Sequence, residues 1–268
     1  MTVLLQVSDP HFGTERPAVV EGLVRLAQEQ RPDVVVLSGD VTQRATAAQF
    51  EAARAFCGRL APAPVLAIPG NHDIPLFDVA ARALRPYARF KAAFGDTLEP
   101  QWQAPALRVV TLNTTRPWRH KDGELSAEQV ERAAACFAGA SAAQWRVVVV
   151  HQPAAVVRDA DARDLLHGHA GAVRRWCEAG VDLVLGGHIH LPYLVPLHER
   201  DTSLPRPLWV VQAGTAVSTR VRHEAGNSVN VLRTLEAEQG RRCRVERWDW
   251  QEKRGAFEVV KSDELATR

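Results

Sequence analysis

Residues 33–40 read Asp-Val-Val-Val-Leu-Ser-Gly-Asp. The apolar run has no polar residue alternating within it, which is typical of a strand buried on both faces of a helix-covered parallel sheet. Gly39 suits a tight turn after the strand, and the carboxylate of Asp40 follows directly. Ligand sites in such sheets form at the carboxyl ends of the strands. This stretch therefore predicts an α/β fold with a functional side chain just beyond a strand.

The segments on either side of this stretch repeat the same pattern. A strand is expected at 3–7 and another at 64–68. Helices are expected at 17–30, 46–60 and 77–94, the first of them with apolar residues recurring on one face. This alternation continues through the first 190 residues and predicts βα units.

The second half of the chain begins in the same way and then changes. Ser126 and Gln129 form a capping-box pattern that predicts a helix to about residue 138. A further helix is expected between the last two strands of the alternating region. Strands are expected at 107–112, 145–150, 181–185, 208–212, 229–235 and 243–250. Because the last three have no long helices between them, we expect antiparallel pairing there. We expect residues 1–250 to form a single domain and 251–268 to form a charged C-terminal tail or an extra strand.

Bulk properties narrow the class of protein. The net charge of the 268-residue chain is only +2, too weak to argue for nucleic acid by itself. Its four cysteines form no CxxC motif and are expected to be buried thiols in a reducing compartment. We find no secretory signal and no apolar run of membrane-spanning length, so a cytoplasmic protein is expected.

Side chains of the types that bind metal ions follow five of the predicted strands. They are Asp9 and His11 after 3–7, Asp40 after 33–37, Asn71 and His72 after 64–68, His151 after 145–150, and His188 and His190 after 181–185. Nitrogen and oxygen donors without thiolate suit Mn, Fe, Co, Ni or Zn better than they suit a cysteine-based structural zinc site. If Asp40 bridges, these segments supply enough ligands for two ions with open positions.

The motifs DxH, GD, GNHD, a lone His and GHxH occur in this order over residues 3–220. Together they resemble the calcineurin-like metallophosphoesterase superfamily. The GNHD form and the chain length resemble its bacterial class III cyclic-nucleotide phosphodiesterase branch. This resemblance implies a four-layer α/β/β/α sandwich of two mixed sheets flanked by helices. It also implies two divalent metal ions, with Mn, Fe or Zn expected.

The resemblance implies a role for each ligand-type residue. Asp9, His11 and His190 would bind one metal, Asn71, His151 and His188 would bind the other, and Asp40 would bridge both. His72 would not be a ligand, and would stabilise or protonate the leaving group. A metal-bridging hydroxide would attack the phosphorus, so Asp40 and His72 are the expected catalytic residues.

One position departs from the family pattern. Many relatives have GDxxD, in which the second aspartate supports the histidine of GNH, but this chain has Gln43 there. The role of His72 as a general acid is therefore left open. Arg44, Arg220 and Arg222 are candidate phosphate-binding residues, because a guanidinium group can bind two phosphate oxygens.

The leading hypothesis is a metal-dependent hydrolase of small phosphodiesters of the cyclic-nucleotide kind. A pyrophosphohydrolase of UDP-2,3-diacylglucosamine is an alternative, although that branch more often has GNRD and needs an apolar groove, for which 74–106 is the candidate. The absence of a basic stripe counts against a nuclease. The complete ligand set counts against an inactive binding scaffold. A small-molecule substrate is expected, and a homodimer is left open.

Overall fold

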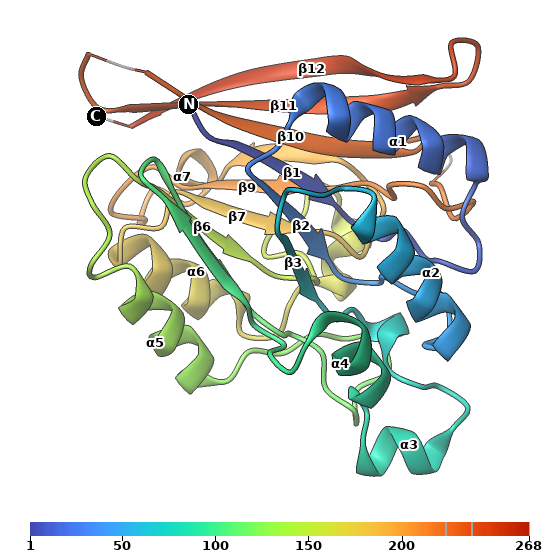
Figure 1. Ribbon diagram of the computed structural model, residues 1–268. Coiled ribbons are helices and arrows are strands. Elements are labelled where there is room, and N and C mark those ends of the chain that lie inside the picture. The colour runs from blue at the N-terminus through green and yellow to red at the C-terminus, as the bar shows by residue number, and fades with distance from the viewer. Residues whose placement is uncertain (223, 237, 268) are drawn as a thin grey trace.

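The strands form two six-stranded sheets in the computed structural model, which describes residues 1–222, 224–236 and 238–267 (Figure 1). The strands are β1 Val3–Val7, β2 Val34–Ser38, β3 Val65–Ile68, β4 Gln101–Ala104, β5 Leu107–Thr111, β6 Trp145–Val149, β7 Leu183–Gly186, β8 Tyr193–Pro196, β9 Trp209–Gln212, β10 Ser228–Leu235, β11 Arg241–Gln251 and β12 Ala256–Thr267. The first sheet has the order β12-β11-β10-β1-β2-β3, and the second β4-β5-β6-β7-β9-β8. In the first sheet, β2 pairs in parallel with both β1 and β3. In the second sheet, β5, β6, β7 and β9 pair in parallel in that order. The carboxyl ends of these strands therefore lie at one edge of each sheet.

Strand β2 shows why the sequence folds in this way. Every residue of Val34–Ser38 is buried. Val34 and Val36 lie in the core between the two sheets, whereas Val35 and Leu37 lie in the core beneath the helices. Because both faces of the strand are covered, each position is apolar, as the sequence predicts.

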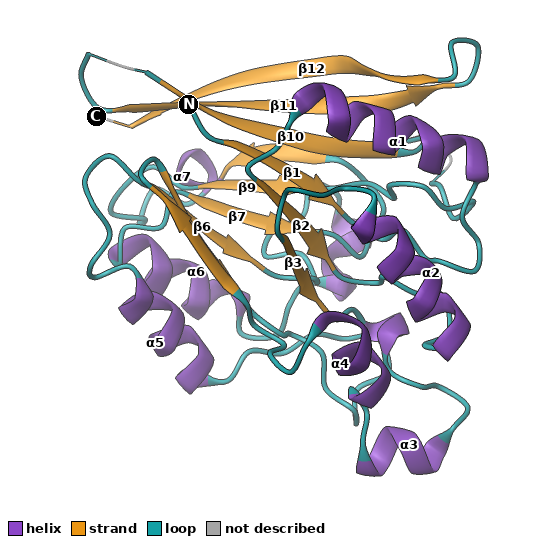
Figure 2. Ribbon diagram, viewed as in Figure 1, coloured by secondary structure: helices purple, strands orange, loops and turns teal. Residues whose placement is uncertain are grey.

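Helices cover the outer face of each sheet, which gives four layers (Figure 2). The helices are α1 Pro17–Gln30, α2 Ala47–Gly58, α3 Val79–Leu84, α4 Ala88–Phe94, α5 Ala127–Cys136, α6 His169–Glu178 and α7 Leu197–Arg200, with 3-10 turns at Asn71–Asp73 and Asp159–Asp164. Residues of α1, α2 and α4 pack on the first sheet, and residues of α5 and α6 on the second. The expected α/β/β/α sandwich is therefore confirmed. None of the helices described combines the length and the apolarity that a membrane crossing requires.

The expected single helix over 77–94 is wrong. The chain forms α3 and α4 instead, with Pro86 between them. Proline lacks the N–H that a helix interior needs, and its ring disfavours helical geometry in the preceding residue. None of the residues in α3 is buried, so packing does not offset this effect.

Two edge strands were not predicted, and the end of the chain is a strand. Strand β4 alternates between exposed and half-buried residues, and β8 lies between the strands expected at 181–185 and 208–212. Strand β12 pairs antiparallel with β11 along its length, so 256–267 is a strand and not a loose tail.

Candidate metal centre

The candidate ligands lie on sharp turns at the carboxyl ends of β1, β2 and β7. Among the described non-glycine residues, seven have a positive φ, and five of these are candidate ligands. The five are Asp9 at 50°, His11 at 44°, Asp40 at 47°, His188 at 73° and His190 at 56°. Such backbone costs on the order of 1–3 kcal/mol per residue and occurs mostly at functional sites. The rest of the fold therefore stabilises strained backbone at the positions of these five side chains.

A first group of donor atoms comes from the ends of β1 and β7. The Nε2 of His190 lies 3.3 Å from Oδ1 of Asp9 and 3.1 Å from Nε2 of His11. The Nε2 of His11 lies 3.9 Å from the same Asp9 oxygen. His11 and His190 are 179 positions apart in the sequence. Their donor atoms and that of Asp9 nevertheless lie close enough together to bind one cation.

A second group lies beside the first, with Asp40 between them. The Nε2 of His151 lies 3.3 Å from Oδ1 of Asp40 and 3.3 Å from Oδ1 of Asn71. His188 also brings a ligand atom within 4.8 Å of those of Asp40 and His151. The other carboxylate oxygen of Asp40 lies 3.7 Å from Nε2 of His11 in the first group. Asp40 thus faces both groups, which is the placement a bridging ligand needs.

One buried imidazole nitrogen without a hydrogen-bond partner indicates that a metal ion fits this site. The Nδ1 of His188 is buried and has no hydrogen-bond partner among the described residues. Buried polar atoms are otherwise nearly always paired, and leaving one unpaired costs about 1–3 kcal/mol. A cation beside Nδ1 would satisfy it, so the donor set fits a metal ion.

Backbone carbonyls fix the orientation of two imidazoles. The Nδ1 of His151 lies 2.8 Å from the carbonyl oxygen of Ser38, and the Nδ1 of His190 lies 2.5 Å from that of Arg220. A carbonyl can only accept a hydrogen bond, so each Nδ1 carries a proton. In the neutral ring, the lone pair of Nε2 then faces the cluster, as in many metal sites. Sequence reasoning missed these partners, because no motif identifies a backbone carbonyl.

The buried carboxylates of Asp9 and Asp40 are charged. Burial alone would raise the pKa of Asp9, but His190 and His151 outweigh this effect and lower it to about 2. Burial also opposes ionisation of Asp40, yet His151 and His72 hold the pKa of Asp40 well below its usual range. In return, despite burial, Asp40 raises the pKa of His151 to about 9, and Asp9 raises the pKa of His190. The two carboxylates therefore favour the protonated forms of His151 and His190 when no metal is bound.

The other two imidazoles are neutral at pH 7. Burial lowers the pKa of His11 to about 3. Burial and the nearby His151 lower the pKa of His188 to about 4. A neutral imidazole is the form that binds metal, so these two rings need lose no proton.

Asp73 fastens the turn after β2 to the turn after β3. Its buried carboxylate accepts hydrogen bonds from the backbone N–H groups of Val41 at 2.9 Å, Thr42 at 2.7 Å and Gly70 at 2.9 Å, and from the hydroxyl of Thr42 at 2.8 Å. Burial and the charge of Asp40 raise the pKa of Asp73 to about 7. The sequence marks Asp73 only as the last residue of GNHD, and the structure shows that it holds the turn carrying Asp40.

His72 lies at the rim of the cluster. Its Nε2 is 4.0 Å from Oδ2 of Asp40, and its backbone N–H donates to Oδ1 of Asp40 at 2.8 Å. Its Nδ1 lies 3.0 Å from the backbone carbonyl oxygen of Gln43. The carbonyl thus supports the ring that an aspartate supports in many relatives. A small cleft of about 50 Å³ adjoins His72 and is also lined by Arg44 and His120.

The three candidate arginines have different surroundings. The guanidinium of Arg44 lies 5.8 Å from the ring centroid of Phe77. Arg222 pairs with Asp161 at 3.2 Å and donates to the carbonyl oxygen of Ile189 at 3.2 Å. Arg220 extends toward His72, with its Nη1 3.5 Å from Nε2 of that ring.

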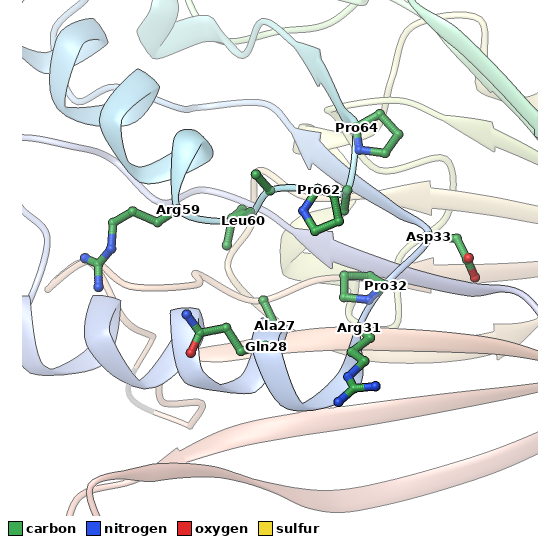
Figure 3. A pocket seen from close by; sticks show the side chains of 11 residues that line it. Ala27, Gln28, Arg31, Pro32, Asp33, Arg59, Leu60, Pro62 and Pro64 are labelled. Atoms are coloured by element: carbon green, nitrogen blue, oxygen red, sulfur yellow. The ribbon is translucent and has the colours of Figure 1, made fainter.

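A larger cavity lies away from these ligands (Figure 3). Its volume is about 540 Å³, and its lining comes from the end of α1, residues 31–33 and residues 59–64. These segments precede β2 and β3, so the cavity is at the edge of the sheet opposite the ligand cluster. This cavity, although it is larger than the cleft beside His72, therefore contains none of the candidate metal ligands.

Known proteins share both the sequence pattern and the fold. The calcineurin-like phosphoesterase family matches residues 2–192. A protein of Synechococcus sp. named "Probable cyclic nucleotide phosphodiesterase" is 26% identical over 203 residues, which cover 71% of this chain and 74% of that protein.

Two solved structures show the same fold. A purple acid phosphatase from yellow lupin matches with a TM-score of 0.72 and 13% identity over 99% of this chain, which spans only 53% of the lupin chain. A dimetal phosphatase from Danio rerio matches with a TM-score of 0.68 and 14% identity, covering 99% of this chain and 98% of that one. At these identities the structures establish the fold alone. The family match over most of the sequence shows that this chain belongs to the calcineurin-like phosphoesterase family.

Proposed function

We propose that this protein is a metal-dependent phosphodiesterase that hydrolyses small diesters of the cyclic-nucleotide kind. The observation that carries the proposal is the placement of Asp40 between two groups of buried and half-buried nitrogen and oxygen donors. Membership of a phosphoesterase family supports hydrolysis of a phosphoester. The similarity to the Synechococcus protein supports a diester as the substrate.

Each part of the site has a chemical role in this proposal. Asp9, His11 and His190 would hold one divalent ion, Asn71, His151 and His188 would hold a second, and Asp40 would be shared between them. When bound, the ions supply positive charge for the phosphate oxygens and lower the pKa of water toward neutrality. His72 lies at the rim with its Nε2 facing the cluster, where it can donate a proton to the departing oxygen. General acid catalysis of this kind contributes roughly 10²–10⁴-fold in rate.

The test is hydrolysis by metal-free protein reloaded with Mn, Fe, Co, Ni or Zn singly. The substrates are bis-p-nitrophenyl phosphate, p-nitrophenyl phosphate and cyclic nucleotides. We expect metal-dependent cleavage of the diesters, lost in Asp40→Ala. Faster hydrolysis of the monoester would mean that the protein is a phosphatase and not a phosphodiesterase. Protein that binds no metal and cleaves neither ester would contradict the proposal.

One observation favours a second candidate, a pyrophosphohydrolase of an acylated sugar nucleotide such as UDP-2,3-diacylglucosamine. Large apolar side chains are exposed on or near α3: Phe77, Val79 and Leu84, together with Trp118 in the loop that follows β5. Arg82 ties this helix to that loop, donating to the carbonyl oxygens of Pro75 and Arg119. An acyl chain could cover these side chains. Cleavage of the acylated substrate in preference to its deacylated form would select this candidate, and equal rates would exclude it.

A further inference from the structure

Gln43 makes two separate contacts, one through its backbone and one through its side chain. Its carbonyl oxygen lies 3.0 Å from Nδ1 of His72. Its side-chain oxygen accepts a hydrogen bond from Nη1 of Arg220 at 3.0 Å. The first contact is available to any residue at position 43, whereas the second depends on the amide. Gln43 therefore leaves His72 supported by the backbone and uses its side chain to hold a cation.

Arg220 is anchored at the metal centre by its backbone. Its carbonyl oxygen accepts from Nδ1 of His190, and its N–H donates to Oγ of Ser218 at 3.2 Å. The guanidinium then extends to Gln43, where its Nη1 comes within 3.5 Å of Nε2 of His72. One residue thus contacts both a candidate ligand and the candidate general acid.

The charge of Arg220 is not neutralised by the protein. Among residues 1–222, 224–236 and 238–267, no carboxylate lies within ion-pair distance of its guanidinium, and no protein group accepts from its Nε or Nη2. Arg222, two positions on, pairs with both Asp161 and Glu224. Arg220 therefore keeps its charge and at least two donor groups available for an anion beside the metal centre.

The position of the guanidinium beside His72 and the candidate metal centre favours a phosphate oxygen as this anion. The Nδ1 of His72 faces the carbonyl oxygen of Gln43, and its Nε2 lies on the side of the ring that faces Arg220 and Asp40. An oxygen bound by the guanidinium would lie next to Nε2. A group that binds a phosphate at this place would also hold the departing oxygen within reach of His72.

We infer that Arg220, positioned by Gln43, binds a non-bridging phosphate oxygen of the substrate. This inference rests on the proposed function, since it assigns the substrate phosphate to the same site. Gln43 acts as a positioning residue, because it restricts a long side chain that would otherwise sample many rotamers. The neutral amide of Gln43 accepts a hydrogen bond from the guanidinium of Arg220 and leaves the charge of Arg220 in place. An aspartate at position 43 would neutralise that charge.

The test measures binding of inorganic phosphate to the manganese-loaded protein by calorimetry, with turnover of bis-p-nitrophenyl phosphate measured in parallel. Arg220→Ala should weaken phosphate binding about 10–100-fold, the usual effect of a hydrogen bond to a charged group. Gln43→Ala should weaken it about 3–10-fold and should raise KM more than it lowers kcat. Manganese content should not change, because both variants keep the carbonyls that orient His190 and His72.

Arg158→Ala is the matched control. This substitution also removes one guanidinium charge. Arg158 pairs with Glu224, and Glu224 lies four positions after Arg220 in the sequence. It should leave phosphate affinity nearly unchanged, since salt screens exposed charges. Free guanidinium should partly restore turnover to Arg220→Ala alone.

Two outcomes would overturn the inference. One is equal phosphate affinity in Arg220→Ala and Arg158→Ala, and the other is no phosphate binding by the wild-type protein. Failure of the proposed function looks different: phosphate binding would depend on Arg220, but no diester would be turned over.

Discussion

Gly187 lies against the carboxylate of Asp9, and its lack of a side chain is what allows this approach. A Cβ at this position would lie 2.6 Å from Oδ2 of Asp9 and would overlap the hydroxyl of Ser8. The backbone N–H of His188 donates to the same carboxylate oxygen at 3.0 Å. Close packing of the backbone thus fixes the position of the Asp9 carboxylate in the candidate metal centre.

We therefore expect Gly187→Ala to displace Asp9 and to lower kcat/KM for a diester about 100-fold, as misplacement of a reacting group by about 1 Å does. Bound metal, measured by atomic emission, should fall as well. Gly58→Ala is the control, because a Cβ there meets nothing within 4 Å. Full activity and metal content in Gly187→Ala would show that the contact is not needed.

We expect His151 to couple metal binding to pH. Its pKa is raised to about 9 in the metal-free site, mainly by Asp40 acting against burial, so the ring is protonated at pH 7. A metal ligand must lose this proton, and metal affinity should therefore increase as pH rises from 7 toward 9. Calorimetric titration with Mn²⁺ at pH 7 should give heats that differ between buffers of different ionisation enthalpy. Equal heats in all buffers would contradict proton release.

At the level of turns and strands, Asp73 joins two segments that carry ligands. Its carboxylate accepts from donors in the turns after β2 and β3. Asp73→Asn puts an NH₂ group against these N–H donors. We expect a loss of about 1–3 kcal/mol in the free energy of unfolding, measured by urea denaturation, together with reduced activity.

Asp78→Asn is the control for Asp73→Asn. Asp78 is the N-cap of α3, a position that asparagine fills equally well, so stability should not change. Equal stability of the two variants would mean that the four hydrogen bonds to Asp73 contribute little.

The sequence predicts these elements well where one local signal dominates. The apolar run of β2 predicts a strand covered on both faces, and parallel pairing then brings the polar residues that follow β1, β2 and β3 together. The single helix expected at 77–94 is wrong because Pro86 separates α3 from α4. Strands β4 and β8 were missed because short edge strands have weak patterns and depend on their neighbours for pairing.

The partners of the ligands were harder to predict, because they depend on the approach of distant segments. Thr215 donates through its hydroxyl to the carbonyl oxygen of Asp9 at 2.6 Å, across 206 residues. The contact between Gln43 and Arg220 spans 177 residues. Neither pair has a sequence spacing that would indicate it.

Across the whole molecule, Asp182 connects the two sheets. It precedes β7 in the second sheet and is fully buried. Its carboxylate accepts from Arg241 of β11, in the first sheet, at 2.6 and 2.8 Å, and from Arg206 at 2.8 Å. The backbone N–H of Arg146 in β6 also donates to it at 2.8 Å. One carboxylate therefore satisfies donors from both sheets at the edge opposite the metal centre.

Asp182→Asn should lower the free energy of unfolding by about 3–5 kcal/mol, because it leaves two partly buried guanidinium groups without a counter-charge. Thermal and urea denaturation would measure the change, and bound metal should be unaffected in the folded protein. Glu21→Gln, which breaks the exposed pair with Arg59, should leave stability unchanged. A similar effect of the two substitutions would contradict the structural role of Asp182.

We propose that the nitrogen and oxygen donors around Asp40 hold two metal ions. Anomalous diffraction at the manganese edge, from crystals of the protein loaded with Mn²⁺, tests this most directly. We predict two peaks, one among Asp9, His11 and His190 and one among Asn71, His151 and His188, with Asp40 between them. A single peak, or density outside these residues, would contradict the account.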